Sequence, residues 1–283
     1  MEVDLHSHSI HSDGTKSPEE LLALARKIGL KVYAITDHDN IEGSKILVSL
    51  PHDDITLYSG VELNAKVEKG QMHILGYNFD LQNVALNNRL KELKEMSISN
   101  IKLYIKLLKE VYNIELPEND IAELLNRKGN IGRPMLALLL IKYGYCTSVQ
   151  DAFDKYLNDE SVRAQKKSIS KEECIKLISD AGGVAVLAHP WSLKMNDNEL
   201  YNEIAYLKSI GLQGIEIIHS RNSEERRSHY HELALEFGLL ETGGTDYHGK
   251  EVKPDIELGS GTNNNVNIQK EDLSILRKVK SRY

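Results

Sequence analysis

Two histidines near the start of the chain have a spacing that suits a metal site. His6 and His8 follow the segment 3–5, which we expect to form a short strand. In an extended chain, residues two apart point to the same face, so the two imidazoles would lie side by side. Asp13 follows on a Ser-Asp-Gly turn. Two neutral imidazoles and a carboxylate suit a zinc, manganese or iron ion, although a His-x-His pair alone is also typical of a polar strand end.

The same spacing returns near the other end of the chain, where Asp246 and His248 follow an apolar segment. Between the two ends, further candidates lie at the edges of apolar segments that are typical of strands: Asp37, His38, Glu62, His73 and His189. Six of the eleven histidines lie at such edges with carboxylates nearby. Chance would rarely place so many there, so the pattern predicts one site built from several segments.

Together these motifs resemble the PHP (polymerase and histidinol phosphatase) phosphoesterases. The resemblance rests on separate pieces in the family's order: His6-Ser7-His8, Ser12-Asp13-Gly14, Thr36-Asp37-His38, Gly60-Val61-Glu62, His73, Ala188-His189-Pro190 and Gly244-Thr245-Asp246-Tyr247-His248. The stretch Ile131-Gly132-Arg133-Pro134 and a long middle insertion resemble one branch more closely, which contains phosphatases of nucleoside monophosphates and nucleotide 3',5'-bisphosphates. That branch often has histidine after Arg-Pro, where this chain has Met135.

The resemblance implies two to three adjacent divalent ions, namely manganese, iron or zinc, with magnesium also compatible. It assigns His6, His8, Glu62 and Asp246 to one ion, Asp13, His38 and His248 to a second, and Glu62, His73 and His189 to a third. The spacing itself supports the pairs His6/His8 and Asp246/His248 without assigning ions to them. Adjacent residues of an extended chain point to opposite sides, so we expect His38 to be a ligand and Asp37 to orient a ligating imidazole.

The function implied is hydrolysis of a phosphate monoester of a small nucleotide through a metal-bridged hydroxide, since clustered ions lower the pKa of water and neutralise phosphate oxygens. We expect Asp37, His189 and Asp246 to be catalytic. Arg133 is the candidate phosphate ligand because guanidinium binds phosphate bidentately, and His219 is a second candidate for substrate contact.

Several alternatives remain open at this point. The same metal chemistry would serve a 5'-3' exonuclease that trims short RNA or DNA, a histidinol-phosphatase-like enzyme, or a related amidohydrolase. A metal-binding module without catalysis is the fourth alternative. The expected partner is a small phosphorylated compound, most simply a nucleotide, or a short oligonucleotide.

Composition excludes some classes of partner. The 35 basic residues are outnumbered by 42 acidic ones, giving a net charge of −7, which argues against a broad basic surface for duplex DNA. The chain has no apolar run of about 18 residues and no signal-peptide pattern, so we expect no membrane partner. Its two cysteines lie away from the histidine motifs and indicate reduced thiols in a cytoplasmic protein.

The elements that must position these residues alternate between strand and helix. Ser17, Pro18 and Glu20 predict a helix start with a capping box, and Ser170 with Glu173 predicts a second one. The predicted strands include 32–36, 184–188 and 214–218, and the predicted helices include 171–181, 198–210, 223–237 and 270–280. This alternation predicts a parallel sheet, and side chains at the carboxyl ends of strands are typical of a β/α barrel.

We count about seven strand–helix repeats, which agrees with the distorted (β/α)7 barrel of the family that the chain resembles. His73 starts rather than ends its apolar run, and a hairpin after Glu62 would explain this. The segment 85–165 has apolar residues at helical spacing only, beginning with a long helix over 87–112. We therefore predict an α/β barrel domain from residues 1–84 and 166–283, and an all-helical insertion, 85–165, that acts as a substrate lid.

Overall fold

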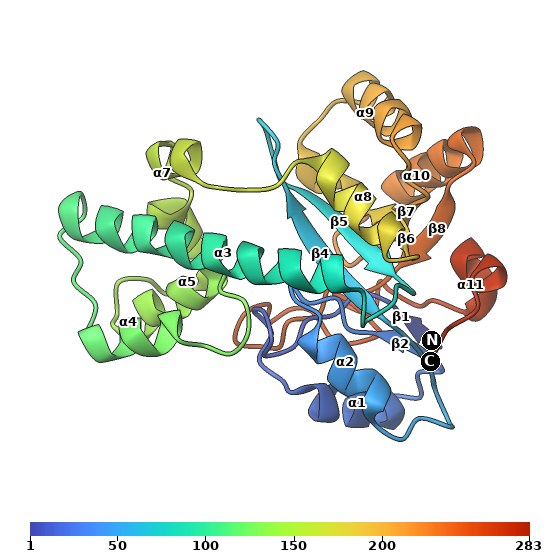
Figure 1. The fold of residues 1–283 in the computed structure, drawn as a ribbon, viewed down its shortest axis with the longest axis horizontal. Helices are drawn as coiled ribbons and strands as arrows, with labels where there is room; N and C mark the ends of the chain where they lie inside the picture. Colours follow the sequence, from blue (N-terminus) through green and yellow to red (C-terminus); the bar gives the residue numbers. More distant parts are fainter.

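The strands form two sheets (Figure 1) in a computed structural model that describes residues 1–283 except for the side chains of residues 163 and 164. The first sheet is parallel and contains β1 (Val3–Asp4), β2 (Val32–Ala34) and β3 (Thr56–Tyr58) in that order. The second contains β4 (Gly60–Ala65), β5 (Met72–Tyr77), β6 (Val184–Leu187), β7 (Gly214–Ile218) and β8 (Leu240–Gly243). In this sheet β5 is antiparallel to both of its neighbours, while β6, β7 and β8 are parallel.

The α/β fold is as predicted, but the strands of the distorted (β/α)7 barrel expected from the sequence form two sheets and no closed barrel in the described residues. The β4–β5 hairpin, which the position of His73 suggested, interrupts the strand–helix repeat and produces a mixed sheet. The two sheets are nevertheless connected, because isolated parallel bridges join Ser7 to Tyr247 and His38 to Glu62. One residue, Ser59, separates β3 from β4, so the chain passes directly from one sheet into the other.

Helices cover the outer faces of both sheets (Figure 1). Helix α1 (Pro18–Lys27) packs against α2 (Glu42–Ser49), and α2 contacts β3. On the second sheet, α8 (Lys171–Asp180) contacts β5 and β6, while α10 (Glu224–Phe237) contacts β7 and α9 (Asp197–Ser209). The closing helix is shorter than the predicted 270–280: α11 (Ser274–Lys278) follows a 3-10 turn, Lys270–Asp272, and the extended backbone of Leu273 separates the two.

The predicted caps are confirmed at one helix and partly wrong at the other. Ser17 and Glu20 form the capping box of α1, with reciprocal side-chain to backbone hydrogen bonds. Ser170 caps α8 by accepting a hydrogen bond from the backbone N–H of Glu173. The carboxylate of Glu173, however, accepts a hydrogen bond from Nε of Arg89 at 2.6 Å instead of closing the box. A side chain expected to stabilise one helix end thus ties α8 to a second helix.

The segment after β5 is helical: α3 (Val84–Glu110), α4 (Glu118–Leu125), α5 (Arg133–Lys142), α6 (Val149–Ala152), a π-helical turn (Phe153–Leu157) and α7 (Glu160–Gln165). The amino-terminal part of α3, with Leu86, Leu90 and Leu93, packs in the main core. Its carboxyl-terminal part, with Ile101 and Tyr104, packs in a separate core of the other helices. Helix α3 therefore carries this group of helices away from the sheets (Figure 1). None of the helices described has both the length and the apolar character needed to cross a bilayer.

Candidate metal centre

The histidines and carboxylates singled out in the sequence converge where the strands end. His6 and His8 follow β1, His38 follows β2, and Asp246 and His248 follow β8. Two backbone hydrogen bonds, from Asp246 N to His6 O and from His8 N to Tyr247 O, are both 2.8 Å long. They align the loop of His6 and His8 with the loop of Asp246 and His248. Residues from opposite ends of the chain therefore face one site.

Glu62 on β4 lies at the middle of this site. Its Oε1 is 2.8 Å from His73 Nδ1 and 2.9 Å from His189 Nε2. Its Oε2 lies within 3.3 Å of ring nitrogens of three further histidines, His6, His8 and His38. Burial alone would raise the pKa of Glu62, yet the surrounding imidazoles of His38, His73 and His6 lower it well below its ordinary value. The carboxylate is thus a charged centre shared by several imidazoles.

The first cluster contains the four residues that the resemblance assigned to one ion. Nε2 of His8 lies 3.2 Å from Glu62 Oε2 and 3.3 Å from Asp246 Oδ1. Nε2 of His6 lies 3.3 and 3.5 Å from the same two oxygens. Ligand atoms that share one ion at about 2.1 Å lie roughly 3.0–3.4 Å apart in octahedral or tetrahedral geometry. The observed spacing fits such a set.

A second cluster surrounds Asp13. Nε2 of His248 lies 3.3 Å from Asp13 Oδ1, Nε2 of His38 lies 3.9 Å from Asp13 Oδ2, and His8 Nδ1 lies 3.6 Å from Asp13 Oδ1. A third group combines Glu62 and His73 with His38. His189, which was expected in that place, also lies beside it, with Nε2 3.3 Å from His73 Nδ1. All nine predicted ligands therefore lie in one contiguous centre.

Hydrogen bonds fix which nitrogen of three histidines carries the proton. Nδ1 of His248 donates to the backbone oxygen of Asp246 at 2.9 Å. Nδ1 of His6 donates to Glu216 Oε1 at 2.8 Å, and Nδ1 of His189 donates to Ser192 Oγ at 2.9 Å. Ser192 Oγ accepts here because its own proton goes to the backbone oxygen of Gln71. Nε2 of His248 and of His189 is consequently left with a lone pair that faces a carboxylate oxygen. Burial opposes protonation of His6, but Glu216, Glu62 and Asp246 raise its pKa well above its ordinary value, so without metal its Nε2 also carries a proton.

Lone pairs that face each other at these distances require a positive charge between them. Burial lowers the pKa of His248 to about 4, so a proton does not supply that charge beside Asp13 at neutral pH. For His8, burial opposes protonation, but Asp246 and Glu62 raise its pKa to about 9. Among the described residues, buried His8 Nε2 and Asp13 Oδ1 have no hydrogen-bond partner. The buried donor set therefore fits several divalent ions.

Three polar residues of the centre were missed by sequence reasoning. Glu216, fully buried on β7, accepts hydrogen bonds from His6 Nδ1 and from the backbone N–H of His189, both at 2.8 Å. Asp4, also fully buried, accepts from the backbone N–H groups of His6, Thr245 and Gly259. The signal was present in both cases, since each is a carboxylate inside an otherwise apolar strand. The ammonium of Lys253 contacts Asp246 Oδ2, and no local pattern marks it.

Asp37, which we expected to orient a ligating imidazole, approaches one only through a serine. The carboxylate of Asp37 does not contact an imidazole directly: it accepts hydrogen bonds from Ser9 N, Ser9 Oγ and Ser12 Oγ. Only through Ser12 Oγ, which lies 3.4 Å from His8 Nδ1, does it approach a ligand. Adjacent Asp37 and His38 point apart, as expected, but the loop after β1 occupies the side that Asp37 faces.

His219, the second candidate for substrate contact, is fully buried. Its Nδ1 accepts a hydrogen bond from the backbone N–H of Arg221 at 2.9 Å, so its Nε2 carries the proton and faces Asp246 Oδ2 at 3.3 Å. The imidazole therefore holds the oxygen of Asp246 that points away from the first cluster.

Arg133 begins helix α5 and lies inside the helical segment. Its Nη1 donates to the backbone oxygen of Leu157 and to Asn158 Oδ1, each at 3.1 Å, and its guanidinium covers the ring of Phe153. The preceding residue, Gly132, lies near the centre, because a Cβ added there would be 3.9 Å from Asp13 Oδ2. Met135, in place of the family's frequent histidine, is buried in the core of the helical segment.

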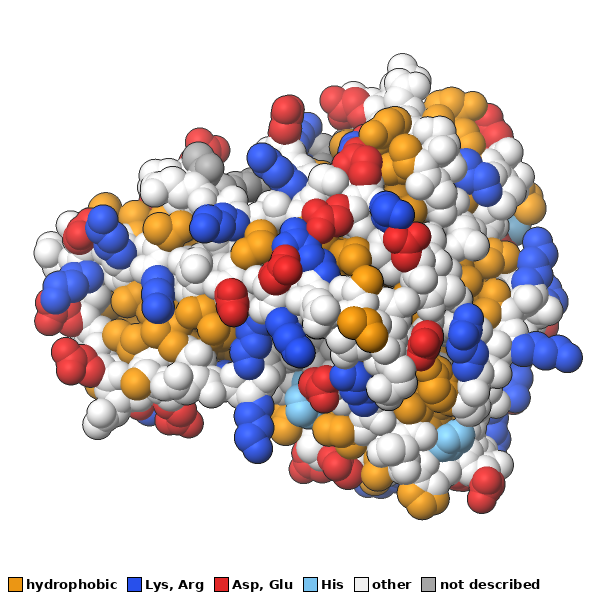
Figure 2. Space-filling view, in the orientation of Figure 1, with side chains coloured by type: hydrophobic (Ala, Val, Ile, Leu, Met, Phe, Trp, Pro, Cys, Tyr) orange, Lys and Arg blue, Asp and Glu red, His pale blue; other side chains and the backbone are white. Residues whose placement is uncertain are grey.

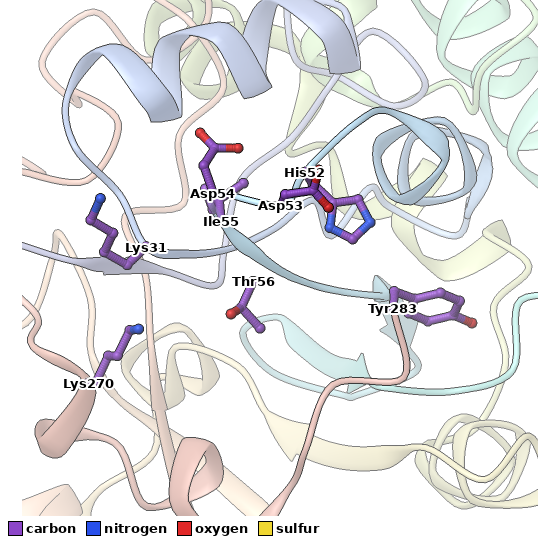
Figure 3. Close-up of a pocket in the computed structure, with 8 residues that line it drawn as sticks. All are labelled: Lys31, His52, Asp53, Asp54, Ile55, Thr56, Lys270 and Tyr283. Atoms are coloured by element: carbon purple, nitrogen blue, oxygen red, sulfur yellow. The ribbon is translucent and has the colours of Figure 1, made fainter.

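A polar pocket of about 270 Å³ lies elsewhere (Figure 3). It is lined by Lys31, His52, Asp53, Asp54, Ile55, Thr56, Lys270 and Tyr283. Lys31 precedes β2 and Thr56 begins β3, so this pocket lies at the amino ends of these strands. The histidines lie at the carboxyl ends, and the pocket is therefore separate from the metal centre.

An α/β fold with a buried histidine–carboxylate centre defines a metal-dependent hydrolase. The chain belongs to the PHP domain family, whose model matches residues 4–210. It is therefore a hydrolase that acts on phosphoester bonds.

Named relatives cover most of the chain. A 5'-3' exoribonuclease Rnm of Escherichia coli K12 is 29% identical over 260 residues, which are 90% of this chain and 87% of the relative. A 3',5'-nucleoside bisphosphate phosphatase of Chromobacterium violaceum is 27% identical over 87% of each chain. The crystal structure of a protein from Bifidobacterium adolescentis, assigned as a metal-dependent phosphoesterase, has a TM-score of 0.78 at 28% identity and covers 92% of this chain and 91% of its own.

Proposed function

We propose that this PHP-family hydrolase is a metal-dependent exonuclease that removes nucleotides from the 5' end of short RNA. The observation that carries the proposal is the position of Glu62, whose two oxygens face histidines of different clusters. Ions bound there would lie close enough to act on one phosphate together. The similarity to 5'-3' exoribonucleases over nine-tenths of the chain favours this substrate over the nucleotide monoester expected from the sequence.

Hydrolysis of nucleoside 3',5'-bisphosphates is the second candidate, and the similarity to the Chromobacterium phosphatase favours it. The two reactions are chemically close. In each, the bond between phosphorus and the 3' oxygen of a nucleotide breaks, and the same nucleotide carries a 5'-phosphate. Only the group on the far side of the phosphorus differs: a hydroxyl in the bisphosphate and the rest of the RNA in the exonuclease substrate.

We assign one ion to His6, His8, Glu62 and Asp246, a second to Asp13, His38 and His248, and a third to Glu62, His73 and His189. A neutral imidazole offers one lone pair, so His8, which contributes Nε2 to the first ion, leaves the second to the other three residues. When bound, the ions supply Lewis-acid stabilisation of phosphate oxygens and an acidified water.

The protein's own residues hold these groups in place and add charge. Glu216 and Ser192 fix the protons of His6 and His189 on Nδ1, which keeps Nε2 available. His219 and Lys253 hold Asp246 Oδ2, so Asp246 Oδ1 faces the first cluster. The partly exposed ammonium of Lys253 also places a positive charge at the edge of the centre, where it would attract a phosphate. Arg133 is our candidate for the 5'-phosphate.

The helical segment would cover the substrate as a lid. Its loop before α5 meets the ligand-bearing loops: Asn130 N donates to His11 O at 2.7 Å, and Asn130 Nδ2 donates to His38 O at 3.1 Å. The lysines of α3 do not form a continuous basic track on the visible face, where basic, acidic and apolar side chains are mixed (Figure 2). Lys94 is hydrogen-bonded to backbone oxygens, and Lys109 pairs with Glu115 at 2.9 Å. This surface suits short RNA better than a long strand.

The decisive experiment follows short RNA labelled at either end after the protein has been loaded with manganese. Hydrolysis from the 5' end releases a labelled mononucleotide from 5'-labelled RNA at the earliest time and shortens 3'-labelled RNA stepwise. Internal fragments would contradict the proposal. Parallel assays with adenosine 3',5'-bisphosphate, AMP and histidinol phosphate, read as free phosphate, test the other candidates.

Two variants serve as controls for this assay. His38→Ala should abolish turnover of every substrate, because His38 lies between two of the clusters. Glu241→Gln should not, because Glu241 pairs with His231 on the outer helix α10 and faces away from the centre. Activity on the bisphosphate alone would select the second candidate. Metal binding without turnover of any phosphoester would identify a non-catalytic module.

A further inference from the structure

Trp191 is the single tryptophan of the chain and lies beside the metal centre. It belongs to the 3-10 turn Pro190–Leu193, which follows His189. The other three residues of this turn are buried, whereas Trp191 is 36% exposed. Trp191 is thus partly exposed next to the centre, and an aromatic ring in that position has a face on which a ligand could stack.

The indole stands next to two imidazoles of the centre. Its ring centroid lies 6.0 Å from that of His189 and 5.9 Å from that of His219. Nε2 of His189 lies 2.9 Å from Glu62, and Nε2 of His219 faces Asp246. One imidazole therefore separates the indole from the carboxylates that would hold the ions.

The turn that carries Trp191 is fixed at both ends. His189 and Lys194 have positive φ angles of +24° and +54°, which side-chain-bearing residues rarely adopt. The loop between β4 and β5 holds the turn through hydrogen bonds from Gln71 N to Ser192 O and from Ser192 Oγ to Gln71 O, both 2.9 Å. Gly70 permits this close contact, since a Cβ there would meet the Ser192 carbonyl oxygen at 2.4 Å. The backbone that carries the indole is therefore held in place, which lowers the ordering cost of binding.

We propose that Trp191 is the platform on which the base of the cleaved nucleotide stacks while its 3' phosphorus lies at the metal centre. The inference rests on the proposed function and names the residue that recognises the nucleotide. In a nucleotide, one ribose ring separates the base from the phosphate. One imidazole ring likewise separates the indole from the metal centre, so a nucleotide could contact both. Stacking uses the face common to all bases, so the platform favours nucleotides over other phosphate esters with little preference among bases.

The first test uses the fluorescence of the single tryptophan, excited where tyrosine does not absorb. AMP should quench the emission of the manganese-loaded protein saturably, whereas ribose 5-phosphate, which lacks the base, should not. A free tryptophan amide corrects for absorption by the nucleotide. Equal responses to the two ligands, or no response to AMP at concentrations that inhibit hydrolysis, would overturn the platform.

The second test compares kcat/KM for adenosine 3',5'-bisphosphate with kcat/KM for the same compound without its base. Stacking of one base contributes about 1–3 kcal/mol, so Trp191→Ala should lower this ratio about 5–150-fold. Trp191→Phe should restore most of it. Tyr201→Ala is the matched control, because Tyr201 is an exposed aromatic residue on α9 that contacts Glu236.

The outcomes separate the inference from the proposed function. An unchanged ratio in a folded Trp191→Ala protein, with active wild type, would overturn the platform alone. A wild-type protein that hydrolyses neither RNA nor the bisphosphate would overturn the proposed function, and the fluorescence titration would still decide whether the indole binds a base.

Discussion

Glu216 and Glu241 are buried carboxylates on neighbouring strands, but only Glu216 faces the histidines. Replacing Glu216 by Gln should weaken metal binding about 10–100-fold, the usual cost of losing an outer partner of a metal ligand. The physical reason is that an amide has only one oxygen. His6 Nδ1 and His189 N would compete for it, and one of the two would face the NH2 group. Metal affinity measured by competition with a chelating dye checks this expectation.

Glu241→Gln provides the control for burial, since it removes a charge from the adjacent strand without changing the centre. Circular dichroism should show that both variants are folded. Equal metal affinity of Glu216→Gln and wild type would show that Glu216 has no part in orienting His6.

Protons compete with metal at the same nitrogens. In the metal-free protein, burial opposes protonation of His8, but Asp246 and Glu62 raise its pKa to about 9. His8 is therefore protonated at neutral pH, and a metal must displace that proton. Burial opposes protonation of His6 as well, but Glu216, Glu62 and Asp246 raise its pKa well above the ordinary value, so it holds a second competing proton. Apparent metal affinity should therefore rise with pH from neutrality through about 9. Calorimetry in two buffers of different ionisation enthalpy measures the released protons, and a release of zero at neutral pH would contradict this account.

Several residues of the centre could be predicted from the sequence because the two ligands of a His-x-His or Asp-x-His pair point to the same side of any extended segment. Glu216 could not be assigned in the same way, because a carboxylate on a buried strand has a role only once its neighbour across the sheet is known. The indirect contact of Asp37 with His8 could not be predicted for a related reason. The alternation of an extended chain correctly predicted that Asp37 and His38 point to opposite sides. The side that Asp37 faces, however, is filled by Ser9 and Ser12 of the loop after β1, which is remote in sequence.

At the scale of elements, the beginning of α5 connects the helical segment to the centre. Arg133→Ala should lower kcat/KM for 5'-phosphorylated substrates about 10–150-fold if the guanidinium binds the 5'-phosphate, since a charge-assisted contact contributes roughly 1.5–3 kcal/mol. The loss should disappear for an RNA with a 5'-hydroxyl. Steady-state kinetics with the two RNAs measures the difference.

Asn158→Ala is the matched control for this variant, because it removes a hydrogen-bond partner of Arg133 and leaves the charge in place. Asn158→Ala should lose about 1 kcal/mol of stability for one hydrogen bond, and Arg133→Ala should lose more, because it also removes the hydrogen bond to Leu157 O and the contact with the Phe153 ring. If Arg133→Ala and Asn158→Ala have the same kinetics, the arginine is structural and the lid does not bind phosphate.

Helix types and approximate bounds followed from periodicity and capping residues, as in α1. The contacts between helices could not be predicted from these local signals. Glu173 is at the position expected for a capping box, yet its carboxylate accepts a hydrogen bond from Arg89 on α3. The start of α3 was predicted within a few residues, but not that its two halves would pack in two different cores, because both halves show the same apolar spacing.

For the whole molecule, the contiguous centre predicts more than one ion per chain. Elemental analysis of protein loaded with excess metal and then desalted should find two to three equivalents of manganese, iron or zinc. Removing the metal should lower the melting temperature, because ligands that bind the native state stabilise it, while the sheets and their cores persist. A ratio of one or less would contradict the assignment of several ions.

The sequence indicated an α/β fold correctly and the arrangement of its strands incorrectly. Counting strand–helix repeats favoured a barrel of seven units, whereas the hairpin that His73 indicated makes the second sheet mixed. The bridges between Ser7 and Tyr247 and between His38 and Glu62 join residues remote in sequence, and no local pattern encodes them.

The pairing of the first loop with the last also determines when the site can form during biosynthesis. Because synthesis runs from the amino terminus, His6, His8, His38 and Glu62 leave the ribosome before Asp246 and His248. Until then the nascent chain presents histidines without the carboxylate that completes the first cluster. A polypeptide truncated before β8 should therefore bind metal weakly, and full loading with metal is an event that follows the synthesis of β8 and the loop after it.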